Sequence, residues 1–217
     1  KKLAALEALV GYPDAWRGYD FEVVPGAFTR NSLAAEKHEA LRQFAKAGTT
    51  YDRNEWLMPT FIVNAYYNPS ANNTGLPAGI LQPPFFGKDR SVAANMGGIG
   101  MVIGHELTHG FDDQGAQFDE RGNMKNWWSK DDAAQFASKG QCVVDQYNAF
   151  EALPGKRLNG ALTLGENIAD IGGVKMAYYA YRAQRAAMEA QQKDRRQRKD
   201  HQISRSIPHA WCSKARD

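Results

Sequence analysis

Four stretches of the chain space their apolar residues as one face of an α-helix requires. They are residues 3–10, 32–47, 129–150 and 163–187. Side chains three or four positions apart lie on the same side of a helix, so each stretch can turn an apolar face toward a core. Gly48 follows the second stretch at the position of a C-terminal cap. Ser129 opens the third stretch, where it forms the pattern of a capping box with Asp132.

Two shorter stretches have the composition of β-strands. Residues 60–67 are rich in β-branched and aromatic side chains, and residues 21–24 predict a second, shorter strand. The prolines, glycines and asparagines of residues 68–79 predict a loop. A strand at the edge of a sheet could pair its backbone with an extended peptide, whereas an inner strand could not. Long helices with few strands predict an α+β fold, mostly helical with a small sheet.

A fifth helix is predicted over residues 91–111, which contain His-Glu-Leu-Thr-His at positions 105–109. Helical residues four apart have Cβ atoms about 5–6 Å from each other, so His105 and His109 can reach one metal ion. Glu106 lies beside the first histidine, where its carboxylate can take a proton from a water held by the metal. The same five-residue pattern also occurs by chance on surface helices, so its flanks must decide.

The flanking residues indicate that this helix is buried. Four glycines fall in or just before the motif: Gly97, Gly98, Gly100 and Gly104. Each costs a helix about 1 kcal/mol relative to alanine. So many glycines predict close packing against another backbone. Two buried histidines and a carboxylate then need polar partners, which a metal ion would supply.

A hydrolytic zinc site usually has three protein ligands, so a third must come from elsewhere. A histidine six residues after His109 would give the metzincin pattern, but that position is Gly115. The better candidate is Glu166, on the helix predicted from residue 163, with Asp170 on the same face. Asp170 could accept a hydrogen bond from a ligand histidine. The alternative is a capping box, in which Glu166 only reaches back to the start of its own helix at Thr163.

Several motifs in order resemble the neprilysin and endothelin-converting-enzyme family of zinc endopeptidases. Besides the His105–His109 motif, they are Gly165–Asp170, Val63–Tyr67 and Pro77–Phe86, within a match from about Trp56 to Tyr181. The resemblance implies a thermolysin-like (gluzincin) fold and one zinc ion per chain. It makes His105, His109 and Glu166 the zinc ligands and Glu106 the general base. It also places Asp170 with the catalytic residues, and makes Asp112 and Asp170 the carboxylates that orient the histidines.

The resemblance also implies residues that bind a peptide substrate. Asn64 and Ala65 match the pair that hydrogen-bonds the substrate backbone. The pocket for the side chain just after the scissile bond is implied to be lined by Ile80, Phe85, Met101, Val102 and Trp211. Considered by itself, the ring of Phe85 fits a core better than a pocket, and only the resemblance places it in the pocket. The implied reaction is hydrolysis of a peptide bond that precedes a hydrophobic residue.

Length and composition set the remaining limits. The 217 residues suffice for one domain with a sizeable core, with residues 1–55 as a helical lead-in, 56–187 as the catalytic core and 188–217 as a charged tail. The formal net charge of +3 gives no general case for nucleic-acid binding. No stretch approaches the length of a transmembrane helix, which needs about 18 uninterrupted apolar residues. No targeting segment is recognised. The resemblance implies an extracellular, periplasmic or membrane-anchored ectodomain. The chain has two cysteines, which allow at most one internal disulfide.

The tail departs from the family pattern. The run Lys193–Asp200 is highly charged, without interleaved aromatic residues, so a solvated extension is favoured over a nucleic-acid-binding segment. Similarity returns at Trp211, but the family's histidine and arginine that stabilise the transition state have no counterpart before Asp217. The alternative function is therefore a catalytically impaired fragment that binds zinc and peptides.

Overall fold

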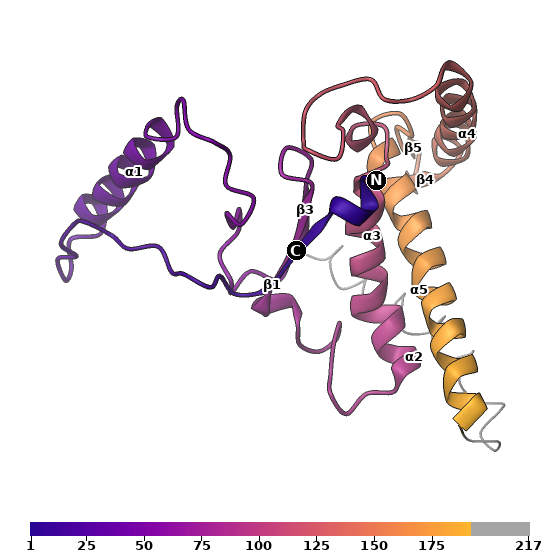
Figure 1. Ribbon diagram of the computed structural model, residues 1–217, viewed down its shortest axis with the longest axis horizontal. Coiled ribbons are helices and arrows are strands. Elements are labelled where there is room, and N and C mark those ends of the chain that lie inside the picture. The colour runs from indigo at the N-terminus through magenta and orange to yellow at the C-terminus, as the bar shows by residue number, and fades with distance from the viewer. Residues whose placement is uncertain (192–217) are drawn as a thin grey trace. The chain divides into compact units, whose positions relative to one another are not determined.

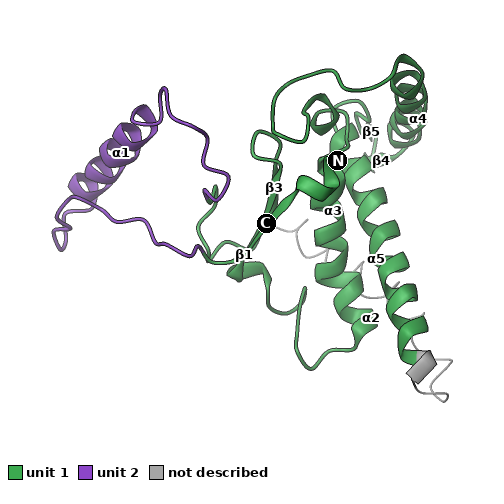
Figure 2. Ribbon diagram, in the orientation of Figure 1, with its two compact units in different colours: residues 1–12, 56–217 green, residues 13–55 purple. Residues whose placement is uncertain are grey.

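The computed structural model describes residues 1–191 and divides the chain into two compact units (Figure 2). One unit consists of residues 1–12 together with residue 56 onward, and the other of residues 13–55. The charged run from Lys193 and the predicted pocket residue Trp211 lie outside the described residues. The proposed site lies entirely within the first unit.

The first unit contains a three-stranded sheet in the order β1-β3-β2. Its strands are β1 (Glu7–Gly11), β2 (Tyr66–Asn68) and β3 (Asn73–Pro77). The central strand β3 pairs parallel with β1 and antiparallel with β2, and all its residues are buried. Tyr66 lies opposite Gly75, and a Cβ on Gly75 would lie 2.2 Å from the Tyr66 ring. Because β2 pairs with β3 on one side only, it forms an edge of this sheet.

The strands correct several predictions for the first half of the chain. Residues 68–79 were predicted as a loop, yet they contain β3; residues 3–10 were predicted as a helix, yet they form a 3-10 turn followed by β1. Pairing on both sides satisfies the backbone of β3, so tertiary context overrides the turn preference of its asparagine, glycine and proline. The strand predicted at residues 60–67 begins only at Tyr66, and residues 21–24 are not paired as a strand.

The predicted helix over residues 91–111 is confirmed, with a local change of winding. It consists of α2 (Val92–Asn95), a π-helical turn (Met96–Gly100) and α3 (Met101–His109). Ser91 caps its start by accepting a hydrogen bond from the backbone N–H of Ala94. At the π-helical turn, the N–H of Ile99 donates to the carbonyl of Phe85 at 2.8 Å. A Cβ on Gly98 would lie 2.2 Å from that same carbonyl, so this glycine permits the contact.

Helix α5 (Leu164–Gln191) packs along α3 (Figure 1). At the crossing, a Cβ on Gly104 would lie 2.9 Å from the Cα of Gly173, and a Cβ on Gly173 would lie 2.7 Å from the carbonyl of Met101. One turn on, a Cβ on Gly172 would lie 2.3 Å from the Thr108 hydroxyl. The two backbones therefore lie closer than side chains would allow, as the glycines of the motif region predicted.

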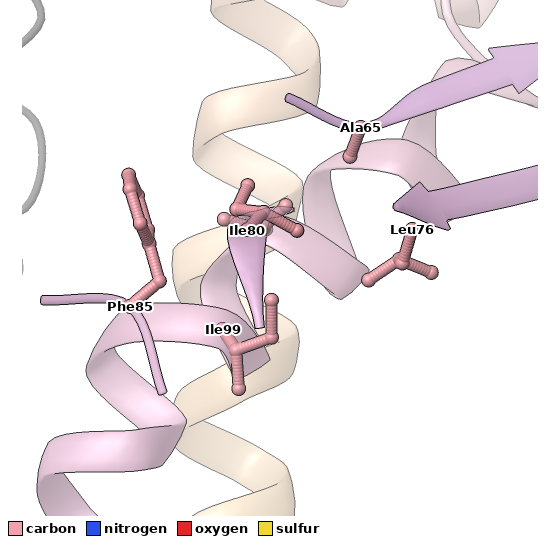
Figure 3. Packing of buried hydrophobic residues seen from close by; sticks show 6 residues of the cluster. Ala65, Leu76, Ile80, Phe85 and Ile99 are labelled. Atoms are coloured by element: carbon pink, nitrogen blue, oxygen red, sulfur yellow. The ribbon is translucent and has the colours of Figure 1, made fainter. Parts of the chain in front are cut away.

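An apolar cluster joins the sheet to the helix that contains α2 and α3 (Figure 3). Its buried members are Ala65, Leu76, Ile80, Phe85, Ile99 and Val102. Ala65 lies just before β2, Leu76 belongs to β3, and the others come from the segment after β3 and from the helix that contains α2 and α3. Burial of this cluster fixes the chain just before β2 against the face of α3 that also bears the motif.

The remaining elements lie around this core. Helix α4 (Lys130–Asn148) begins as predicted at Ser129, whose hydroxyl accepts a hydrogen bond from the Asp132 N–H. A short hairpin follows, made of β4 (Glu151–Leu153) and β5 (Lys156–Arg157). No helix among residues 1–191 is long and apolar enough to cross a bilayer.

The second unit is built around α1 (Phe28–Phe44). Within it, the carboxylate of Glu55 accepts hydrogen bonds from Arg17, Arg42 and Lys46. Burial alone would raise the pKa of Glu55, but Lys46 and Arg42 outweigh it and lower the pKa. This ionic cluster ties the two ends of the unit to its helix.

Replacing Gly104 with alanine should destabilise the first unit. Helix propensity favours alanine by about 1 kcal/mol, but the new methyl group would meet the backbone of Gly173, and overpacking of this kind costs about 1–3 kcal/mol. Gly140→Ala in α4 is the matched control, because the nearest atom to its Cβ is a Leu164 methyl at 3.8 Å. Denaturant unfolding of the metal-free proteins measures both. If G104A proves as stable as G140A, the two helices do not depend on this contact.

Candidate metal centre

Three side chains converge on one point between α3 and α5. The Nε2 atoms of His105 and His109 lie 3.0 Å apart. The Oε2 atom of Glu166 lies 3.3 Å from the first nitrogen and 3.6 Å from the second. Among the described residues these three form the group of potential metal ligands. The histidines lie one turn apart on α3, and the carboxylate comes from the first turn of α5.

Carboxylates fix the orientation of both histidine rings. Nδ1 of His105 lies 2.8 Å from Oδ1 of Asp170, and Nδ1 of His109 lies 2.7 Å from Oδ2 of Asp112. An ionised carboxylate only accepts hydrogen bonds, so each Nδ1 donates, and in the neutral ring Nε2 is then an acceptor. Two acceptor nitrogens and a carboxylate oxygen thus face one another. A proton could link only two of these three atoms, whereas a metal cation would serve all three.

The spacing of the three atoms suits a zinc ion. Zinc lies about 2.0–2.2 Å from histidine nitrogen and carboxylate oxygen in tetrahedral sites. Tetrahedral ligands at that distance are separated by about 3.3–3.6 Å, close to the observed 3.0, 3.3 and 3.6 Å. Each ligand histidine also donates its other ring nitrogen to a carboxylate, as zinc-binding histidines generally do. The residues present therefore fit zinc with three protein ligands and one open position.

The charges around the site also favour a cation. Burial opposes the charged form of His109, but the hydrogen bond with Asp112 and the negative charges of Glu106 and Glu166 outweigh it. The pKa of His109 is therefore raised. A site that attracts a proton in this way attracts a metal ion for the same electrostatic reason.

A cavity of about 500 Å³ opens over the three ligands. Glu106 is 6% exposed and lines this cavity beside the two histidines. Four of the residues predicted to bind substrate also line it: Asn64, Ala65, Ile80 and Val102. Asn64 and Ala65 precede the edge strand β2, and the Ala65 N–H donates to the side-chain oxygen of Asn64 at 3.0 Å. The cavity therefore combines a cation site, a carboxylate and the approach to an exposed sheet edge.

Two other predicted pocket residues lie elsewhere. Phe85 is 3% exposed and belongs to the apolar cluster, outside the lining of the cavity. Met101 lines a separate cavity with Tyr147 and Tyr178. Met101 and Val102 therefore line different cavities, although they are neighbours on α3.

The capping-box alternative for Glu166 is wrong. The backbone N–H of Thr163 donates to the carbonyl of Asn159, and the Thr163 hydroxyl accepts a hydrogen bond from the side chain of Asn167. The start of α5 is thus satisfied by its neighbours in sequence. Glu166 turns instead toward the two histidines.

Sequence reasoning missed several residues around the cavity. The cavity is also lined by Tyr66, Tyr67 and Gln114. The two tyrosines belong to the Val63–Tyr67 motif, but no role was predicted for them. From the sequence, Gly115 served only to exclude the metzincin pattern, which has a histidine at this position. In the structure a Cβ at Gly115 would lie 1.8 Å from the carbonyl of His109, so the loop after α3 can fold back onto the helix only with glycine here. Such a contact leaves no periodic signal in the sequence.

Comparison with known proteins agrees with this geometry. The model of peptidase family M13 matches residues 64–217. Membrane metallo-endopeptidase-like 1 of Mus musculus is 50% identical over 156 residues, which cover 71% of this chain and 20% of that protein. Neprilysin of Homo sapiens is 41% identical over 192 residues, which cover 83% of this chain and 26% of that protein.

A solved structure is similar in fold. The zinc metalloprotease ZMP1 of Mycobacterium tuberculosis, in complex with an inhibitor, superposes with a TM-score of 0.79 at 44% identity. The match covers 84% of this chain and 29% of that one. The chain thus spans about a quarter or less of the length of the two curated relatives described above.

Replacing Glu166 with alanine should greatly reduce zinc binding, because it removes one of three converging ligands. We expect one zinc ion per wild-type chain and at least about a hundred-fold weaker binding in E166A, beyond the 10–100-fold typical of residues that only support a ligand. Glu36→Ala, the same change at an exposed position of α1, is the control and should bind zinc normally. Competition with a chelating dye measures the affinities. Equal zinc affinity in E166A and E36A would remove Glu166 from the site.

Proposed function

The chain belongs to peptidase family M13, and we propose that its first unit is the zinc-binding catalytic part of a metalloendopeptidase. The observation that carries this proposal is the convergence of His105, His109 and Glu166, with acceptor atoms 3.0–3.6 Å apart. The expected cofactor is one zinc ion per chain. The expected partners are peptides, because the cavity over the ligands opens beside a sheet edge.

The residues around the cavity have distinct roles in the proposed hydrolysis. Bound zinc would supply Lewis-acid polarisation of a peptide carbonyl and would acidify water. The carboxylate of Glu106 takes the proton of the attacking water and later delivers it to the leaving nitrogen. Asp170 and Asp112 keep His105 and His109 in the tautomer that presents Nε2.

Substrate would bind along the edge strand β2 and the residues that precede it. An extended peptide can hydrogen-bond to an edge strand, and Asn64 and Ala65 lie where such a peptide would pass the metal site. The Ala65 N–H already donates to Asn64, so substrate would have to exchange this internal hydrogen bond for its own. Ile80 and Val102 form an apolar part of the lining. They favour a hydrophobic side chain just after the cut.

Two further assignments belong to the same proposal. Ligand-bearing helices beside a small sheet support the thermolysin-like architecture. An extracellular, periplasmic or membrane-anchored location is supported by the relative whose name describes it as a membrane metallo-endopeptidase.

A second candidate is a zinc- and peptide-binding protein that hydrolyses slowly. Within the described structure, no lysine or arginine lines the cavity over the ligands. Loss of one preorganised donor to a developing oxyanion typically costs about 10²–10³ in kcat. Measurable peptide binding with a turnover no higher than that of the metal-free protein would favour this candidate.

Exchange of Glu106 for glutamine separates metal binding from chemistry. The amide keeps the shape of the side chain but cannot accept the proton, and general bases typically contribute about 10²–10⁴-fold to rate. E106Q should therefore retain one zinc ion per chain and lose hydrolysis of a fluorogenic peptide with a hydrophobic residue after the cut. Glu36→Gln serves as the control. Wild-type turnover in E106Q would exclude Glu106 as the base, and loss of zinc would give it a structural role.

A further inference from the structure

The side chain of Lys2 is buried next to the metal centre, although it lies 113 residues before Gly115 in the sequence. Only 5% of this residue is exposed. Its ammonium group donates to the carbonyl of Gly115 at 2.6 Å and to that of Phe118 at 2.8 Å. Both carbonyls belong to the loop that follows α3. Buried lysines are rare without such partners, so this placement calls for an explanation.

Aromatic rings surround the ammonium group. Its nitrogen lies 5.8 Å from the ring centroid of Tyr67 and 5.6 Å from that of Phe111. Cations at this distance are attracted by the ring faces. Burial lowers the pKa of Lys2 to about 8, while Asp112 and Asp119 act in the opposite direction. At pH 7 the Lys2 side chain is therefore positively charged in most molecules.

A chain of direct contacts leads from Lys2 to a zinc ligand. Gly115 accepts from Lys2 through its carbonyl and donates its N–H to Oδ1 of Asp112 at 2.6 Å. The other oxygen of Asp112 lies 2.7 Å from Nδ1 of His109. Asp112 is itself only 4% exposed, so its negative charge needs nearby compensation.

Lys2 is also anchored from the side of the sheet. Its backbone carbonyl accepts a hydrogen bond from the side-chain amide of Asn72 at 3.0 Å. The oxygen of that amide accepts from the hydroxyl of Tyr67 at 2.9 Å. Asn72 is completely buried and precedes β3, while Tyr67 lies in β2. The lysine therefore connects the rigid sheet to the loop that carries Asp112.

We propose that Lys2 is a positioning residue of the zinc site. Its ammonium group holds the loop from Asp112 to Phe118 and balances the charge of Asp112, which keeps that carboxylate aligned with Nδ1 of His109. Lys2 thereby contributes to zinc affinity without touching the metal. The inference rests on the proposed zinc site, and it assigns to the beginning of the chain a role that its sequence alone did not suggest.

Lys2→Met tests this role, because methionine keeps an apolar stem between the rings but removes the charge and the donor. We expect zinc binding to weaken by about ten-fold or more, as for other residues that support metal ligands. Lys1→Met is the matched control, since Lys1 is exposed, and it should bind zinc as the wild type does. Affinity is measured by chelator competition on the folded proteins.

A mutant cycle with Asp112→Asn distinguishes positioning from a general effect on the fold. If Lys2 acts through Asp112, K2M should add little further loss of zinc affinity in the D112N background. A purely structural lysine would give the same factor in both backgrounds, and that result would overturn the proposal. Lys2→Arg, which keeps the charge, should restore most of the affinity lost in K2M.

The remaining outcomes are also decisive. If K2M does not fold, Lys2→Gln replaces it, because glutamine keeps an amide N–H group that can donate but lacks the charge, and it should also weaken zinc binding. Failure of both uncharged variants to fold, even with zinc present, would make Lys2 a folding residue and overturn the proposal. Wild-type protein that binds no zinc would refute the proposed function. Wild type and K2M that bind zinc equally tightly would refute the role of Lys2 alone.

Discussion

The close approach of α3 and α5 is the constraint on which the rest of the site depends. Gly104 and Gly173 let the backbones touch one residue before His105, and Gly172 makes room for Thr108 one turn later. Because the contacts run forward along α3 and backward along α5, the two helices are antiparallel. Asp170 lies one turn before Gly173 and Glu166 lies two turns before it. Both residues are therefore brought alongside the two histidines. Side chains at the crossing would push the third ligand away from the other two.

Electrostatics make this packed arrangement suitable for a metal. The site gathers the carboxylates of Glu106, Asp112, Glu166 and Asp170 around two histidines, and the pKa of His109 is raised. Glu106 and Asp112 are buried, and their charges would be costly to bury without a nearby cation. The buried ammonium of Lys2 is linked to Asp112 through Gly115 and offsets part of that charge. Packing thus fixes where the acceptors lie, and their charges determine what they bind.

The three side chains that converge at the candidate site could be picked out from the sequence because their signals are local. The spacing of His105 and His109 follows from helical geometry, and the glycines correctly indicated a close helix contact. The helix α1 was predicted at nearly its observed place, but the strands of the first 80 residues could not be predicted in the same way. The buried strand β3 consists of residues typical of turns, and only its pairing on both sides keeps it extended. The contacts of Lys2 and Gly115 join distant parts of the chain and leave no periodic pattern.

A crystal structure of the zinc-loaded protein, with anomalous diffraction recorded at the zinc absorption edge, tests the central claim most directly. The account predicts one zinc peak bonded to Nε2 of His105, Nε2 of His109 and a carboxylate oxygen of Glu166, at about 2.0–2.2 Å. Nδ1 of each histidine should still face Asp170 or Asp112. Zinc bound through Nδ1, or at a position that excludes Glu166, would contradict it.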